Sequence, residues 1–252
     1  MDLSLFCDTY IIAEYSHLAG IINNMPRYKT GMHEGKQVIR EYFVNDDKVS
    51  RRVVNENSRF YAEKQKQFEF YNTLQQNLAQ YKQELIRRRL TFPGDFRFIR
   101  EPSSYNNDAW NQMIPCSNPR EISNEYYDDY GFHVRTRGEM MVGNALKDLG
   151  LEAKYEPTLV LKGGRKKSPD YSFPVPVIDR CFFVEFMGMA DDEGYIESNY
   201  GKIDEYMRSG ILLNRDLIVI TGTGNWLPEQ ESIKRIIAAF INNAVLSAYN
   251  RK

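Results

Sequence analysis

Ser168-Pro-Asp-Tyr-Ser-Phe173 is the first of two strand-like segments on which the fold of this chain depends, and the second is Cys181-Phe-Phe-Val-Glu-Phe-Met-Gly188. Each segment carries one carboxylate, that of Asp170 or that of Glu185, inside an apolar and aromatic run. An unpaired carboxylate is costly to bury, so each acid needs a compensating partner. Because oxygen ligands from neighbouring strands suit a hard cation, the pair predicts a shared divalent ion such as Mg²⁺.

The sequence around these segments predicts an α/β (α+β) domain. Gly150 and Gly210 are good helix stops, and the apolar run Leu217-Ile-Val-Ile-Thr221 is typical of a buried strand. The expected order is a helix over 136–149, strands at 155–161, around Asp170 and around Glu185, a helix over 191–209, a strand at 217–221 and a helix over 228–249. The first three strands can pair as a meander. The fourth follows a crossover helix and should lie parallel to the Glu185 strand.

Glu139 is a third carboxylate in an apolar setting. It shares one face of the 136–149 helix with three aliphatic residues, Val142, Leu146 and Leu149. Taken alone, Glu139 could satisfy free backbone N–H groups at the helix start, or pair with Arg135 or Arg137. Together with Asp170 and Glu185, it indicates three inward carboxylates and hence a metal site. For each strand acid the alternative is an ion pair with a nearby Lys or Arg.

The N-terminal part of the chain predicts a separate module. Strands are expected at 36–44 and 48–54, joined by a polar turn at 45–47, after an opening helix over 3–22. Residues 55–90 contain no Gly or Pro and predict a helix of ~50 Å. It carries a heptad seam that consists of Tyr71, Leu74, Leu78, Tyr81 and Leu85. The seam could pack on its own protein, or it could form a homodimer through the 57–90 helix.

The expected division of the chain follows its proline content. Pro93, Pro102, Pro115 and Pro119 punctuate residues 93–130, which predicts a connector with one short helix around Ala109-Trp110. The connector separates an N-terminal hairpin and long-helix module (1–92) from a C-terminal domain (131–252).

The composition of the chain excludes several classes of protein and of binding site. The 252 residues have a formal net charge of −1, so contact with nucleic acid must come from local basic clusters. The three cysteines are far apart and fit a reducing cytoplasm better than a disulfide framework. No apolar run approaches the ~18 residues of a membrane span. The first twenty residues carry three acids and no basic segment, so we expect no signal peptide.

Several short motifs follow one another in a fixed order between residues 135 and 210. They are Arg135-Thr-Arg-Gly-Glu139, Tyr155-Glu156, Pro169-Asp170-Tyr171, Val184-Glu-Phe-Met-Gly-Met189 and the series Tyr195, Lys202, Tyr206 and Gly210. As a set, they resemble the restriction-endonuclease-like PD-(D/E)xK nuclease superfamily. They are most like an uncharacterised bacterial branch with the motifs R-S-K-S-E, P-D-F and W-E-H-x-G-M. The resemblance spans Trp110 to about Thr221.

The resemblance implies roles for the matching residues. Asp170 and Glu185 would bind Mg²⁺ or Mn²⁺, with the backbone carbonyl of Phe186 as a third protein ligand. Glu139 would contact the metal through water or hold a second ion. The metal would activate water for attack on a phosphodiester. The implied activity is endo- or exonucleolytic, on DNA rather than RNA.

The chain departs from the superfamily at one important position. The lysine that usually stands two residues after the strand acid is Met187 here, and the branch's histidine beside that acid is Phe186. Lys202 is the natural substitute, because it shares one face of the next helix with Tyr195 and Tyr206. The alternative for Lys202 is a solvated side chain beside packing tyrosines.

Basic side chains near the three acids could contact phosphates. They are Arg135, Arg137 and the turn residues Arg165, Lys166 and Lys167. The turn could equally be a solvated hairpin loop. A second function follows from the missing strand lysine, namely an inactive nuclease fold that binds nucleic acid or serves as a scaffold. A third is a structural dimer built on the heptad seam, because a fold alone does not fix a function.

Overall fold

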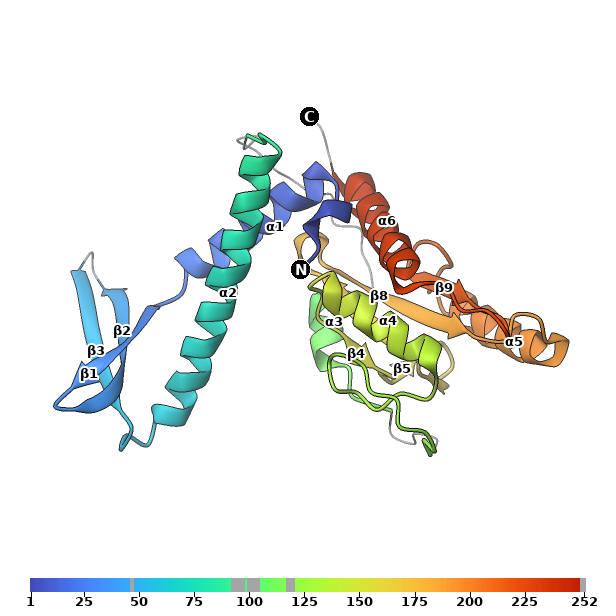
Figure 1. The fold of residues 1–252 in the computed structure, drawn as a ribbon, viewed down its shortest axis with the longest axis horizontal. Coiled ribbons are helices and arrows are strands. Elements are labelled where there is room, and N and C mark those ends of the chain that lie inside the picture. Colours follow the sequence, from blue (N-terminus) through green and yellow to red (C-terminus); the bar gives the residue numbers. More distant parts are fainter. Residues whose placement is uncertain (46–47, 92–97, 99–104, 117–120, 250–252) are drawn as a thin grey trace. The chain divides into compact units, whose positions relative to one another are not determined.

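The computed structural model describes residues 1–45, 48–91, 98, 105–116 and 121–249, which form a mixed α+β protein (Figure 1). The chain separates into two compact units. One unit comprises Met1–Tyr10 and Phe96–Lys252, and the other comprises Ile11–Asp95. Within the described ranges, no helix combines the length and the apolarity that crossing a bilayer would require.

The C-terminal unit is built on a four-stranded sheet. Its strands are β4 (Lys154–Tyr155), β7 (Tyr171–Val175), β8 (Arg180–Met187) and β9 (Leu217–Thr221), in the order β4-β7-β8-β9. The pairings β4/β7 and β7/β8 are antiparallel, and β8/β9 is parallel. The predicted meander and the predicted parallel fourth strand are therefore both confirmed.

The strand expected at 155–161 is interrupted. After β4 the chain turns away at Glu156, whose φ of 44° lies in the left-handed region that few side chains adopt. Pro157 follows and has no N–H to donate to a ladder. The rest of the segment, β5 (Leu159–Val160), pairs with β6 (Lys166–Lys167) in a separate hairpin. The basic turn predicted at 162–167 is the end of this hairpin.

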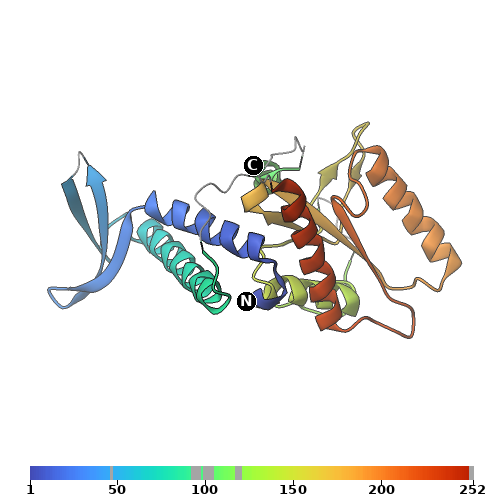
Figure 2. The ribbon, with the colours of Figure 1, turned by 90° about the horizontal axis from the view of Figure 1, so that it is seen from above.

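One face of the sheet packs against two helices. These are α4 (Arg137–Asp148) and α6 (Gln230–Ala248), which lie against each other (Figure 2). Side chains alternate along β8, and Phe182 stacks edge-on against Phe240 of α6, with ring centroids 5.1 Å apart. Phe186 lies on the same face, so close to Gly138 of α4 that no side chain fits there.

The opposite face packs against α3 (Asn107–Gln112) and α5 (Glu193–Arg208). Here the alternate residues of β8 form a buried core with side chains from both helices, namely Cys181, Phe183, Met187, Trp110, Ile203 and Tyr206. Because Glu185 lies between Phe183 and Met187 in this alternation, its carboxylate belongs to the face of α3 and α5.

The observed division of the chain differs from the predicted one in two places, the connector and the first ten residues. The short helix expected in the connector is α3, but its Trp110 is buried in the core and its indole N–H donates to Ser172 of β7 at 3.0 Å. Residues 105–116 and 121–130 therefore belong to the C-terminal unit. So do the first ten residues, because Asn242 of α6 donates to the carbonyl of Leu5 and accepts from the N–H of Cys7.

The N-terminal unit contains a three-stranded antiparallel sheet. Its strands are β1 (Arg27–His33), β2 (Lys36–Asn45) and β3 (Lys48–Asn55). The β2/β3 hairpin matches the prediction, and residues 46–47 of its turn lie outside the described residues. β1 was not predicted, because its Arg-Tyr-Lys-Thr-Gly-Met-His pattern has little apolar alternation. The opening helix is a 3₁₀ turn (Leu3–Leu5) followed by α1 (Asp8–Asn23).

The long helix is α2 (Tyr61–Arg87), and it begins six residues later than predicted. The chain first turns at Asn55, whose carbonyl accepts from the N–H of Ser58 at 2.9 Å. At 1.5 Å per residue, the 27 residues span about 40 Å. Three residues of the heptad seam, Leu74, Tyr81 and Leu85, are buried within the single chain. The seam therefore packs in large part internally.

Replacing Leu78 by lysine tests the internal packing of the seam. Leu78 is half-buried between Leu74 and Tyr81, so the added charge should lower the melting temperature, by roughly 2–4 °C for each kcal/mol lost. Gln83→Lys adds the same charge at an exposed position of α2 and should leave the melting temperature unchanged. If Leu78→Lys instead halved the sedimenting mass at an unchanged melting temperature, the seam would be a dimer interface.

Candidate metal centre

The register of β7 and β8 brings Asp170 and Glu185 together. Tyr171 is paired with Val184, so Asp170, one residue before β7, faces Glu185. The backbone N–H of Phe186 donates to Oδ2 of Asp170 at 2.6 Å, which fixes that carboxylate beside β8. Glu185 is 3% exposed, and Asp170 is partly buried. The two strand acids are therefore neighbours, as the sequence predicted.

Lys202 of α5 points at this acid pair. Its Nζ lies 2.7 Å from both carboxylate oxygens of Glu185. Tyr206, one helical turn further along α5, donates its hydroxyl to Oε1 of Glu185 at 2.8 Å. The predicted position of the Lys202 amine is confirmed, since the side chain turns inward rather than into solvent. The cluster of Asp170, Glu185, Lys202 and Tyr206 is called the acid cluster below.

The acid cluster contains two carboxyl groups but only one cationic side chain, that of Lys202. Burial raises the pKa of Asp170 well above its ordinary value, and the nearby charge of Glu185 raises it further. Burial also raises the pKa of Glu185, although the Lys202 ammonium opposes that shift. Burial would lower the pKa of Lys202, but the carboxylates of Glu185 and Asp170 outweigh it and raise that pKa. Two carboxylates thus share one ammonium, an imbalance that a bound cation would relieve.

Glu139 lies on α4 and has partners of its own. Its Oε2 accepts from the hydroxyl of Tyr155 at 2.7 Å and from the backbone N–H of Arg135 at 3.0 Å. Its own N–H donates to the hydroxyl of Thr136 at 3.1 Å, as in a helix cap. Glu139 therefore satisfies the backbone N–H of Arg135, just before the start of the helix. Its charge still contributes to the raised pKa of Asp170.

The three-acid ligand set expected from the sequence is not found. Among the residues that the structure describes, no three His, Cys, Asp or Glu side chains gather closely enough to hold a metal ion. The reason is that Glu139 projects from α4, which packs on the sheet face opposite to that of Glu185. The chemistry of Asp170 and Glu185 still fits Mg²⁺ as two carboxylate ligands, which must be completed by backbone carbonyls, water or substrate oxygens.

Arg135 is engaged in a pair that the sequence analysis did not assign. Its guanidinium binds Glu156 through both terminal nitrogens, with Nη2 2.6 Å from Oε2. The hydrogen bonds that Arg135 donates to Glu156 raise the pKa of Arg135. Arg135 is therefore not free to contact phosphate as predicted. The sequence signal was Glu156 itself, an acid next to a proline at the end of a strand.

The basic β5–β6 hairpin is partly neutralised. Arg165 and Lys167 each lie 3.4 Å from a carboxylate oxygen of Glu205 on α5. Lys166 is exposed. These ion pairs favour the interpretation of the turn as a structural loop.

A cavity of about 860 Å³ is lined by Phe186 and Gly188, which follow Glu185 along the chain, but by none of the four residues of the acid cluster. The first turn of α4, including Arg137 and Glu139, forms one wall, and the 223–229 loop forms another. Tyr195 of α5 also lines the cavity, and its hydroxyl accepts from the N–H of Gly188 at 3.3 Å. Burial raises the pKa of Tyr195, and the charges of Asp170 and Glu185 add to the shift. Tyr195 thus lines the cavity and is near enough to the acid cluster for the charges of Asp170 and Glu185 to act on it.

Comparison of the chain with protein-family models, curated proteins and solved structures gave no match. The functional assignment therefore depends on the geometry of the acid cluster and its cavity.

Proposed function

We propose that the C-terminal unit is a Mg²⁺-dependent nuclease with a restriction-endonuclease-like core, acting on DNA rather than RNA. The acid cluster is the observation that supports this proposal. Asp170 and Glu185 from adjacent strands face each other, and the amine of Lys202 lies 2.7 Å from Glu185. A net negative, partly buried pair of carboxylates beside a lysine is a suitable site for a divalent cation and a phosphodiester.

The order of elements supports the same proposal. A helix, a three-stranded meander, a crossover helix and a parallel strand follow one another. Glu185 lies on the central strand β8, and Asp170 directly precedes the other central strand, β7. This order is compatible with the restriction-endonuclease-like core that the sequence resemblance implies.

Each residue of the site has a role in the proposed reaction. Asp170 and Glu185 would hold Mg²⁺, which when bound lowers the pKa of a water ligand and offsets phosphate charge. Tyr206 fixes the carboxylate of Glu185 by its hydrogen bond. Arg137, which lines the cavity at the start of α4, would contact the phosphate.

Lys202 has a raised pKa and is therefore an ammonium at neutral pH in the metal-free protein. In that state it orients the attacking water and the phosphate by hydrogen bonds rather than taking a proton. A cation held by the same carboxylates would repel the ammonium and lower its pKa towards the value that a base requires.

Metal titration and cleavage assays test the proposal together. We expect calorimetry to show binding of Mg²⁺ or Mn²⁺, and labelled single- and double-stranded DNA to be cut only when the metal is present. RNA of the same sequences should be cut more slowly. Absence of both metal binding and cleavage over a full substrate panel would contradict the proposal.

An inactive nuclease fold that binds nucleic acid or serves as a scaffold is the alternative. Two observations favour it. Met187, at the usual lysine position, is packed into the core, and Lys202 and Tyr206 already bond both oxygens of Glu185. Metal binding without cleavage would identify this alternative.

A further inference from the structure

The three-stranded sheet of the N-terminal unit has two chemically different faces. On one face Tyr28, Glu41 and Arg52 are paired across the strands. Glu41 is buried there and accepts from Lys64 of α2 at 2.7 Å and from Tyr28 at 3.1 Å. Its second oxygen lies 3.4 Å from Arg52. The charges of this face are therefore compensated within the unit.

The other face carries cations around one tyrosine. The strand register places Tyr42 of β2 between Arg27 of β1 and Arg51 of β3. Two residues further along β1, on the same face, Lys29 is paired with Arg40 of β2. Arg27, Lys29, Arg40, Tyr42 and Arg51 are together called the basic face. The residues that point to this side in the described strands include no Asp or Glu. No carboxylate of the described residues forms an ion pair with Arg27, Lys29 or Arg51, all of which are exposed.

This arrangement is unfavourable for the fold alone. Like charges directly opposite each other on neighbouring strands destabilise a sheet, and Lys29 is paired with Arg40. The guanidinium of Arg40 turns aside over Gly31 and donates to the carbonyl of Met32 at 3.0 Å. The exposed cations of this face are therefore Arg27, Lys29 and Arg51. The chain as a whole has a net charge of −1, so the basic face is a local concentration of positive charge rather than part of a general excess. An uncompensated cluster of this kind is complementary to a polyanion.

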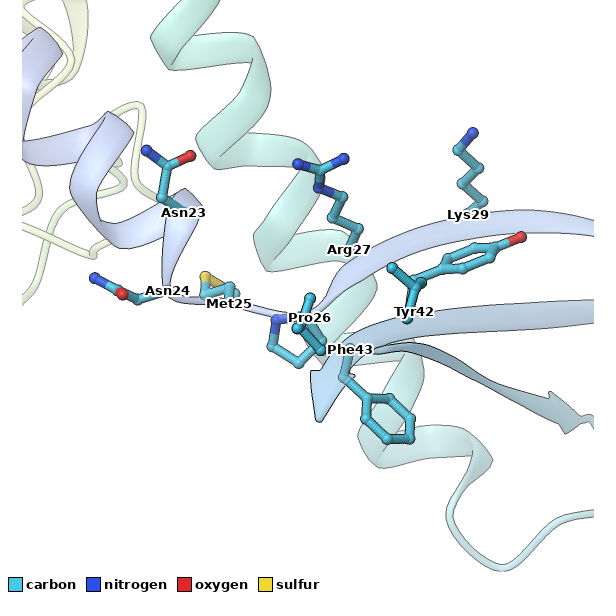
Figure 3. A pocket seen from close by; sticks show the side chains of 10 residues that line it. Asn23, Asn24, Met25, Pro26, Arg27, Lys29, Tyr42 and Phe43 are labelled. Carbon is cyan, nitrogen blue, oxygen red and sulfur yellow. The ribbon is translucent and has the colours of Figure 1, made fainter. Parts of the chain in front are cut away.

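A hollow adjoins the basic face. A cavity of about 640 Å³ is lined by Arg27, Lys29 and Tyr42, with Val44 and Val49 at the end of the hairpin (Figure 3). Figure 3 shows Arg27 and Lys29 extending from β1 to one side, whereas Phe43 of β2 extends to the other. Tyr42 is half-buried, lies between Arg27 and Arg51 in the strand register and lines the hollow.

We propose that the basic face binds single-stranded nucleic acid. The cations would contact successive phosphates, and an unpaired base would stack on Tyr42 beside the hollow. Bases inside a duplex cannot reach an aromatic ring on a sheet, which is why a single strand is the occupant. The proposal goes beyond the proposed nuclease function, because binding here requires neither metal nor cleavage.

Fluorescence anisotropy on the full-length chain tests the proposal. The probes are oligo(dT) and oligo(rU) of about 15 nucleotides, a length that one small binding module covers. The Asp170→Asn background without divalent ions keeps this test separate from cleavage. We expect the triple variant Arg27→Gln, Lys29→Gln, Arg51→Gln to bind at least about tenfold more weakly. The slope of log affinity against log salt should fall by roughly 2.

A second triple variant is the matched control. Arg52→Gln, Lys66→Gln and Lys82→Gln remove the same total charge from the same unit but leave the basic face intact. This control should keep both the affinity and the salt slope of the parent. Equal weakening by the two triple variants would show that net charge alone drives binding, and would overturn the proposal.

Tyr42 distinguishes stacking from simple charge attraction. Tyr42→Phe should preserve affinity, whereas Tyr42→Leu should weaken it about tenfold, since stacking contributes roughly that much per base. The triple variant of the basic face should melt no lower than the parent, because Arg27, Lys29 and Arg51 are exposed and no ion pair within the described residues is lost. Failure of both oligonucleotides to bind, tighter binding to duplex, or binding only to phosphatidylserine vesicles would each contradict the proposal.

Discussion

Asp170→Asn is expected to abolish cleavage and to weaken Mg²⁺ and Mn²⁺ binding. The substitution keeps the size of the side chain but replaces a charged ligand with a neutral amide, which a hard cation binds far less well. The measurements are calorimetric metal titration and a cleavage assay under identical conditions. An equal metal affinity in the variant and the parent would show that Asp170 is not a ligand.

The same variant should become more stable without metal. Burial and the charge of Glu185 raise the pKa of Asp170, so the ionised form is unfavourable in the folded state. A raised folded-state pKa contributes stability that is present at low pH and is lost as the pH rises through that pKa. Asparagine does not ionise, so the Asp170→Asn variant does not lose this stability as the pH rises. Near neutral pH its melting temperature should therefore be higher than that of the parent.

Asp204→Asn is the matched control for these measurements. Asp204 is exposed on α5 and pairs with Arg208, away from the acid cluster. The control removes one carboxylate from the same unit and should leave metal binding, cleavage and metal-free stability close to those of the parent.

Lys202→Met is expected to reduce cleavage by ~10²-fold or more while metal binding is largely retained. The amine is a hydrogen-bonding and proton-transfer group rather than a metal ligand, whereas methionine keeps a similar length without charge. Removing the ammonium also leaves Glu185 without its cation, so the metal-free variant should melt at a lower temperature. Added Mg²⁺ should restore most of that stability.

Met187→Lys in the Lys202→Met background is the decisive companion variant. Met187 lies on the same sheet face as Glu185, so a lysine there would return an amine to the acids from the strand. If this double variant recovered cleavage, the amine would be the group whose removal had caused the loss of cleavage in Lys202→Met. If Lys202→Met cleaved as well as the parent, Lys202 would be only an ion-pair partner of Glu185.

The local pattern of the sequence determined the core of the C-terminal unit. Glycine stops, the apolar run of β9 and the crossover rule were sufficient to predict α4, α5, α6 and the parallel pairing of β8 with β9. Asp170 and Glu185 could be identified from the sequence alone, because a carboxylate is out of place inside an apolar run. The position of Lys202 followed from helical spacing, because Lys202 and Tyr206 share one face.

Tertiary structure decided the partners of the remaining charged groups. Glu139 is on the apolar stripe of α4, as predicted, but the stripe packs on the sheet face opposite to Glu185, and the sequence does not specify which face a helix covers. Arg135 forms an ion pair with Glu156 because the chain turns sharply after β4. The basic face likewise depends on register. Arg51 and Arg52 are adjacent in sequence, and only the pairing with β2 places Arg52 on Glu41 and Arg51 beside Tyr42.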